Sequence, residues 1–119
     1  MIKVYAYQKC DSCRKAIKWL NTHNIQFEEI AIRETPPTII ELTSMLKAQG
    51  KLKSLFNTSG MDYRSMGLKE TLPNLSQQQA LLLLSEHGNL VKRPFVIGNN
   101  IHLLGFKEAQ WEAAFETQK

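Results

Sequence analysis

Residues 4–20 read VYAYQKCDSCRKAIKWL, and this stretch decides the fold. Residues 4–7 carry β-prone side chains and predict a short strand. Asp11 and Ser12 are residue types that often cap helices, and apolar residues then recur at helical spacing, namely at Ala16, Ile17, Trp19 and Leu20. The sequence therefore predicts a strand that is followed at once by a helix, with Cys10 and Cys13 in the turn at the helix N-terminus.

Residues 25–30 alternate mostly between apolar and polar side chains and predict a second strand. A strand, a helix and a second strand form a crossover unit, which favours parallel pairing of the two strands. After the prolines at positions 36 and 37, Thr38 is expected to cap a helix that runs through about residue 48 and stops at Gly50. We expect that helix to bury Ile39, Leu42, Met45 and Leu46.

The rest of the chain predicts further helices and a hairpin. A short helical piece is expected near residues 63–66 in a loop-rich section, and Ser76 with Gln79 fits a capping box that opens a helix over residues 76–87. Residues 92–97 and 101–104 flank a turn at 98–100 and predict a β-hairpin, and a closing helix spans residues 107–115. This order predicts a single α/β domain over residues 1–119, a thioredoxin-like fold (β-α-β then β-β-α) with a helical insertion at about residues 34–91.

Composition narrows the class of protein. The chain has 119 residues, 43% of them hydrophobic and 22% charged, which excludes disordered and fibrous chains. The longest purely apolar run, residues 80–84, is far shorter than the roughly 20 residues of a membrane span, and the first residues enter a strand pattern rather than a signal peptide. The net charge of +4 is spread along the chain. We expect a cytoplasmic monomer with no membrane contact and no direct nucleic-acid binding.

The only two cysteines of the sequence form a Cys10-x-x-Cys13 pair. Because a disulfide across so short a loop removes little unfolded-state entropy, a purely structural bridge is not expected. Redox chemistry is the leading interpretation, since a CxxC between a strand and a helix is typical of thiol–disulfide exchange. Two alternatives stay open: two small buried hydrophobic residues, or zinc, for which only His23, His87 and His102 remain as further donors.

Cys10 is the expected nucleophile of the pair. A thiolate at a helix N-terminus is stabilised by the helix dipole and unpaired N–H groups, and Lys9, Arg14 and Lys15 add positive charge that Asp11 opposes. We therefore expect a lowered pKa for Cys10. Cys13, one helical turn later, would resolve a mixed disulfide on Cys10.

Three other features have two interpretations each. Pro94 opens a strand after Arg93, and in this layout such a proline is either a cis residue facing the cysteines or an ordinary strand-edge residue. An arginine there could hold an oxyanion or a thiolate. Residues 57–60, NTSG, form either an anion-binding nest or a simple turn. We expect Trp19, Trp111 and Phe115 to be core residues rather than a binding face.

Five motifs together resemble the arsenate reductase (ArsC) family, and within it the Spx/MgsR-type branch. The resemblance covers nearly the whole chain and implies a thioredoxin-like fold with a helical insert. The motifs are CDSCRKA at residues 10–16, LFNTSG at 55–60, YR at 63–64 with GL at 67–68, KRP at 92–94 and LGF at 104–106.

The resemblance implies two classes of function. In glutaredoxin-linked arsenate reductases, the cysteine that matches Cys10 attacks arsenate, and three arginines surround the oxyanion. Arg93 matches one of them, whereas the other two positions fall at Asn57 and Gly105. Because two charges are missing, we do not expect efficient arsenate reduction.

The other class consists of redox regulators. In Spx-like proteins, a CxxC that matches Cys10 and Cys13 is a thiol–disulfide switch, and the protein binds the C-terminal domain of the RNA polymerase α subunit. The sequence thus predicts a thiol-dependent reductase with Cys10, Cys13 and Arg93 as its reactive residues, supported by Arg14, Asn57 and Pro94, with the Spx-like regulator as the alternative. No bound cofactor is implied, and glutathione, glutaredoxin or thioredoxin would donate electrons.

Overall fold

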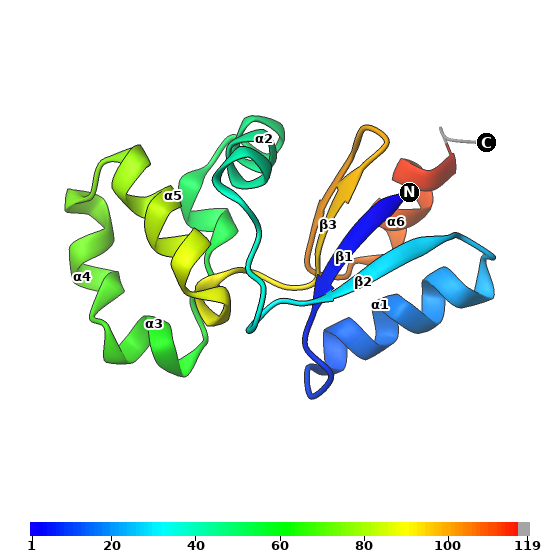
Figure 1. Cartoon of the computed structure of the whole chain (residues 1–119), viewed down its shortest axis with the longest axis horizontal. Coiled ribbons are helices and arrows are strands. Elements are labelled where there is room, and N and C mark those ends of the chain that lie inside the picture. The colour runs from blue at the N-terminus through cyan, green and yellow to red at the C-terminus, as the bar shows by residue number, and fades with distance from the viewer. Residues whose placement is uncertain (117–119) are drawn as a thin grey trace. The chain divides into compact units, whose positions relative to one another are not determined.

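The computed structural model describes residues 1–116, which form two compact units. The first, here called the sheet unit, comprises Met1–Ile30 and the segment from Arg93 onward. The second, the helical unit, comprises Ala31–Lys92 and is therefore inserted in the sequence between the two parts of the sheet unit (Figure 1). None of the helices in the described residues is long and apolar enough to span a bilayer.

A four-stranded sheet in the order β2-β1-β3-β4 organises the sheet unit. Its strands are β1 (Ile2–Ala6), β2 (Phe27–Ala31), β3 (Phe95–Gly98) and β4 (Ile101–Leu104). β3 is antiparallel to both neighbours, with Val96 opposite Val4 on one side and Leu103 on the other. Because the sheet is mixed, β2 is the parallel neighbour of β1, as the crossover through α1 (Asp11–Thr22) predicts. The α/β thioredoxin-like order predicted from the sequence is confirmed.

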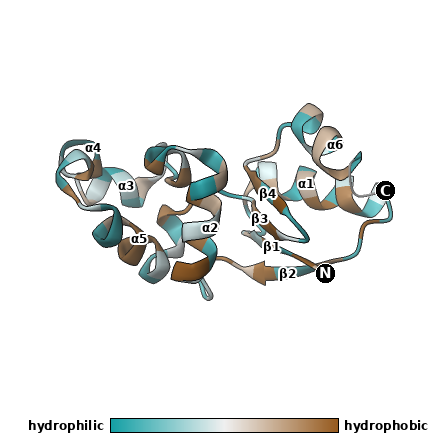
Figure 2. Cartoon of the chain, turned by 90° about the horizontal axis from the view of Figure 1, so that it is seen from above, coloured by the Kyte–Doolittle hydropathy of each residue, from teal (hydrophilic) through white to brown (hydrophobic). Residues whose placement is uncertain are grey.

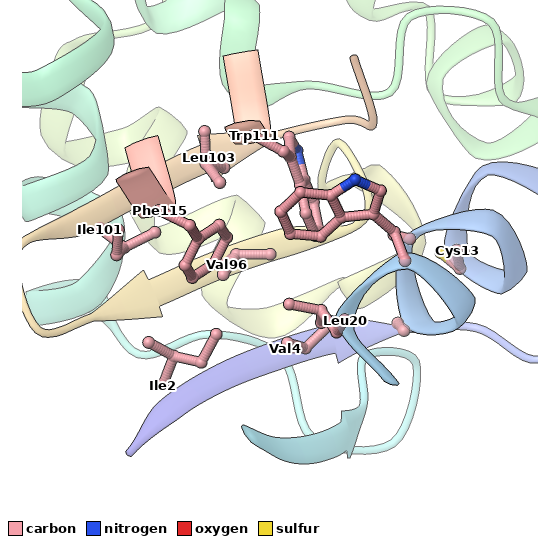
Figure 3. Packing of buried hydrophobic residues seen from close by; sticks show 12 residues of the cluster. Ile2, Val4, Cys13, Leu20, Val96, Ile101, Leu103, Trp111 and Phe115 are labelled. Carbon is pink, nitrogen blue, oxygen red and sulfur yellow. The ribbon is translucent and has the colours of Figure 1, made fainter. Parts of the chain in front are cut away.

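The core of the sheet unit lies between one face of the sheet and the helices α1 and α6 (Glu108–Glu116). Strand residues with a period of two point to this face, and the strands that supply them are mainly hydrophobic in Figure 2. Figure 3 shows how the side chains of the strands, of α1 and of α6 interlock. Trp19, Trp111 and Phe115 are all buried there, which confirms their predicted packing role.

The helical unit owes its order to local capping signals. Thr38 caps α2 (Ile39–Gln49) through a reciprocal capping box with Glu41, with hydrogen bonds of 3.0 and 3.1 Å, and α2 ends at Gly50 with φ of 81°. Ser76 and Gln79 form a second capping box at α5 (Gln77–Glu86), as predicted. The remaining elements are η1 (Leu52–Leu55), α3 (Met61–Ser65), α4 (Leu68–Thr71), η2 (Leu72–Asn74) and η3 (Gly88–Leu90).

Several boundaries differ from the predictions. The second strand begins at Phe27 rather than at residue 25, and β3 begins at Phe95, because Pro94 has no N–H to donate to the sheet. Ile39, which was expected in the core, is 46% exposed, because it is the first residue of α2 and its neighbours Leu42 and Met45 fill the buried face. The closing helix begins at Glu108.

One glycine of the helical unit is required by packing. Gly88 lies against the backbone of Ile32, and a Cβ at Gly88 would overlap the Ile32 carbonyl oxygen. The backbone at this point comes too close for any side chain. Gly88 thus fixes the approach of η3 to the segment that follows β2.

Candidate active site at the N-terminus of helix α1

Cys10 itself is the N-cap of α1. β1 ends at Ala6, and a tight turn follows in which the Cys10 N–H donates to the Tyr7 carbonyl at 3.0 Å. The backbone of Cys10 is extended, with φ of −91° and ψ of 120°, and its sulfur accepts a hydrogen bond from the Cys13 N–H at 3.4 Å. The sequence-based expectation that Asp11 or Ser12 caps the helix was therefore wrong, because sulfur occupies the position that a cap oxygen usually takes.

The two cysteines differ in exposure. Cys10 is half-buried, whereas Cys13 is only 1% exposed and belongs to the core beside α1 (Figure 3). Both are free thiols in this structure. A reagent from solution therefore meets Cys10 first, and Cys13 is placed to react with Cys10 rather than with solvent.

The surroundings of Cys10 favour its thiolate. Burial is the largest single influence and alone would raise the pKa of this thiol, but hydrogen bonds from the thiol and the backbone N–H of Cys13, together with Arg93, outweigh it. The guanidinium of Arg93 lowers the pKa further through a hydrogen bond and its positive charge. The net result is a pKa below the ordinary value for cysteine, as the sequence predicts.

The surroundings of Cys13 have the opposite effect. Burial is the main cause and, together with the hydrogen bond that the Cys13 thiol donates to the Cys10 sulfur and the charge repulsion from Cys10, it raises the pKa of Cys13 to about 12. The Tyr7 N–H and the Arg93 charge only partly oppose this rise. The two thiols are thus divided into one that ionises readily and one that stays protonated while Cys10 carries the charge.

Arg93 reaches this site from the other half of the sheet unit. The Arg93–Pro94 peptide bond is cis, and Pro94 is buried at the entrance to β3, which pairs with β1. The Arg93 guanidinium carbon lies 5.2 Å from the centroid of the Tyr7 ring. Of the two interpretations of Arg93-Pro94, the structure shows the one in which the arginine approaches the cysteines.

The other expected cations are engaged elsewhere. Arg14 and Lys15 form ion pairs with Asp11, at 3.5 and 3.1 Å, and all three side chains are well exposed. Arg14 also donates to the Gln8 carbonyl at 3.2 Å. Hydrogen bonding to Lys15 is the first cause of the lowered pKa of Asp11. The positive charge that affects Cys10 therefore comes from Arg93, not from the basic residues on α1.

Asn57 and Gly105 have structural partners. Asn57 belongs to the helical unit, where its N–H donates to the Leu90 carbonyl at 2.7 Å and its carbonyl accepts from the Gly60 N–H at 3.1 Å. The Thr58 N–H donates to the carbonyl of residue 56. Residues 57–60 therefore form a turn and not an open nest, since these N–H groups are already bonded within the chain.

Gly105 connects the hairpin to the closing helix. Its N–H donates to the Pro94 carbonyl at 2.9 Å, and its carbonyl accepts from the Trp111 indole at 3.1 Å. Its φ is 70°, a backbone conformation that strongly favours glycine. Where the resemblance places a reductase arginine, this chain therefore has a residue that the turn itself requires.

An open pocket of about 570 Å³ lies along α1 and is lined in part by Tyr7, Cys13 and Arg14. Within residues 1–116, no three His, Cys, Asp or Glu side chains are grouped so as to hold a metal ion.

Sequence reasoning missed Tyr7, which was counted as the last strand residue. It lies one residue beyond β1 and three before Cys10, and its aromatic type at that place was the available signal.

The fold and these residues define a class: a thioredoxin-like domain with a helical insertion and a CxxC pair at the N-terminus of its first helix. The chain belongs to the ArsC family, whose family model matches residues 5–114.

Three proteins with different descriptions illustrate what the chain is similar to. An uncharacterised protein, YusI, of Bacillus subtilis is 46% identical over 109 residues, which cover 91% of this chain and 92% of YusI. The global transcriptional regulator Spx 1 of Lactococcus lactis is 30% identical over 95% of this chain and 88% of its own length. The crystal structure of a possible arsenate reductase from Streptococcus mutans shares 36% identity and a TM-score of 0.87, covering 95% of this chain and 97% of that one.

Proposed function

We propose that this protein is a cytoplasmic thiol–disulfide redox protein, a thiol-dependent reductase in which Cys10 is the nucleophile and Cys13 the resolving thiol. One observation carries the proposal: a half-buried cysteine with a lowered pKa caps the helix that holds a buried second cysteine one turn later. Low-pKa, accessible thiols followed by a protected partner are typical of disulfide exchange.

The first step is attack by the Cys10 thiolate on one sulfur of a substrate disulfide. The Cys10 sulfur forms a new S–S bond, the substrate S–S bond breaks, and the leaving thiolate takes a proton from water. Arg93 stabilises the attacking thiolate before this step and faces the reacting sulfur during it.

The second step forms the intramolecular disulfide. Once Cys10 is in a mixed disulfide it bears no negative charge, so its repulsion of a Cys13 thiolate and its hydrogen bond to the Cys13 thiol both vanish. The pKa of Cys13 then falls, because two of the causes that raise it are gone. The Cys13 thiolate attacks Cys10, releases the second substrate thiol, and leaves two electrons on the reduced substrate.

A dithiol or two monothiols must then reduce the Cys10–Cys13 bridge. Glutathione, glutaredoxin or thioredoxin would donate these electrons, and no bound cofactor is needed. We propose disulfides rather than arsenate as the preferred substrates. A dianionic oxyanion needs several charge-assisted contacts, and of the three family positions this chain has only Arg93, with Asn57 and Gly105 at the others.

Equilibration in glutathione buffers, followed by trapping of free thiols and mass spectrometry, tests the proposal. We expect one reversible Cys10–Cys13 bridge with a midpoint near the cytosolic glutathione poise, roughly −220 to −320 mV. Cys10→Ser should abolish reduction of a glutathione mixed disulfide without loss of the fold. A protein that forms no bridge at any buffer ratio would contradict the proposed mechanism.

The similarity to the Lactococcus lactis regulator supports a second candidate, a redox-responsive transcriptional regulator. In this case the same thiol pair would control binding to the C-terminal domain of the RNA polymerase α subunit. The test is calorimetric titration of that domain into the dithiol and disulfide forms. A difference of tenfold or more in affinity would support the regulator, and equal affinities or no binding would rule out the switch.

A further inference from the structure

Tyr7 contacts all three of the residues proposed to take part in the reaction, Cys10, Cys13 and Arg93. Its carbonyl accepts from the Cys10 N–H at 3.0 Å, and its N–H donates a hydrogen bond to the Cys13 sulfur. Its ring lies under the Arg93 guanidinium, 5.2 Å from centroid to guanidinium carbon. The backbone of one residue thus orients both cysteines, while its side chain contacts the arginine.

The ring contact matters because an arginine side chain is long and has many rotamers. The backbone places Arg93 just before β3, which pairs with β1, but the direction of so long a side chain depends on its own contacts. A guanidinium over an aromatic face, within about 6 Å, is attracted by the negative face of the ring. Because both Tyr7 and Arg93 are half-buried, solvent weakens this attraction only in part.

We propose that Tyr7 is a positioning residue whose ring holds the Arg93 guanidinium beside the Cys10 sulfur, so that rapid thiolate attack requires an aromatic side chain at position 7. This inference rests on the proposed function and adds to it the residue that places the only family-matched arginine. The required chemistry is a flat π face and not the phenol hydroxyl. Phenylalanine should therefore replace tyrosine, and an aliphatic residue of similar size should not.

The charged residues beside Cys10 do not offer a substitute for Arg93. On α1, Arg14 and Lys15 are paired with Asp11. Lys9 is exposed in the preceding turn and is not among the groups that shift Cys10. Loss of the ring should therefore reduce the fraction of Cys10 thiolate directly.

The experiment measures alkylation of Cys10 by iodoacetamide from pH 5 to pH 10 in the full-length reduced protein, with each cysteine resolved by mass spectrometry. The variants are Tyr7→Phe, Tyr7→Leu and Tyr7→Met, and Gln8→Ala is the matched control in the same turn. At low pH we expect a roughly threefold slower rate for the leucine and methionine variants, and rates within about 1.5-fold of wild type for the other two. At high pH all rates should converge.

A double-mutant cycle with Arg93→Met shows whether Tyr7 acts through the arginine. In the Arg93→Met background, Tyr7→Leu should cause no further slowing. The proposal is overturned if the aliphatic variants keep the wild-type pH profile, if phenylalanine fails to rescue it, or if Tyr7→Leu slows alkylation equally without Arg93. Alkylation needs no disulfide, so absence of a Cys10–Cys13 bridge in wild type would refute the proposed function and not the role of Tyr7.

Discussion

Replacing Arg93 by methionine should slow the first chemical step about fivefold at pH 6. Methionine keeps much of the length of the side chain and removes its charge and its donors. A hydrogen bond to a charged group contributes about 1.5 to 3 kcal/mol, but Cys10 is only half-buried, and solvent screening reduces the effect to about 1 kcal/mol. At 1.36 kcal/mol per factor of ten, this corresponds to roughly fivefold less reactive thiolate.

The assay is single-turnover release of glutathione from a mixed disulfide, recorded from pH 5 to pH 10. The pH profile of Arg93→Met should shift to higher pH, with little change above the ordinary thiol pKa, because the thiolate is then fully formed in both proteins. Arg14→Met is the matched control. It removes the same charge from an exposed side chain that already pairs with Asp11. Equal slowing by the two substitutions, or no shift with Arg93→Met, would refute the assignment of the stabilising charge.

Three further predictions concern Cys13 and Gly88. Cys13→Ser should trap a mixed disulfide on Cys10 that intact-mass spectrometry detects; rapid turnover without accumulation would argue against Cys13 as the resolving thiol. The raised pKa of Cys13, about 12 against an ordinary 9.0, should lower the free energy of unfolding of the reduced protein by at most about 1.4 kcal/mol between pH 8 and pH 10 relative to Cys13→Ala, because only the unfolded chain ionises this thiol there and the lowered pKa of Cys10 acts in the opposite direction. Urea unfolding at both pH values tests this, and parallel pH dependences would contradict it. Gly88→Ala should lower the free energy of unfolding by about 2 kcal/mol, because the new Cβ overlaps the Ile32 backbone. Gly50→Ala, where only the positive φ is strained, should lower it by about 1 kcal/mol. Equal urea midpoints for these two variants would show that the backbone near Gly88 gives way freely.

Sequence reasoning succeeded where the signals are local. The capping boxes at Thr38 and Ser76 need only residues three positions apart, so both helices were predicted with their starts. The hairpin follows from the turn at residues 98–100 between two apolar runs. The short elements between residues 51 and 75 were less well predicted, because helices of three to five residues are too brief to show a period.

The candidate site was predicted only in part, because its geometry depends on contacts between distant residues. The spacing of Cys10 and Cys13 identified the pair, but whether Arg93 faces it depends on the pairing of β1 with β3. Two of the positive charges nearby in sequence, on Arg14 and Lys15, form ion pairs with Asp11 instead. The sulfur cap has no sequence signal, and the aromatic type of Tyr7 does not say which side chain its ring contacts, so both depend on the folded structure.

Because the helical unit is inserted between the two parts of the sheet unit, the residues of this site are synthesised at different times. Cys10 leaves the ribosome long before Arg93, and the two become neighbours only after β3 joins β1 across the inserted Ala31–Lys92 segment. A nascent or unfolded chain therefore carries two cysteines without the arginine that activates Cys10. The activation of Cys10 by Arg93 and the burial of Cys13 therefore arise only when the sheet is complete, so the chemical difference between the two thiols is a property of the finished fold and not of the local CxxC sequence.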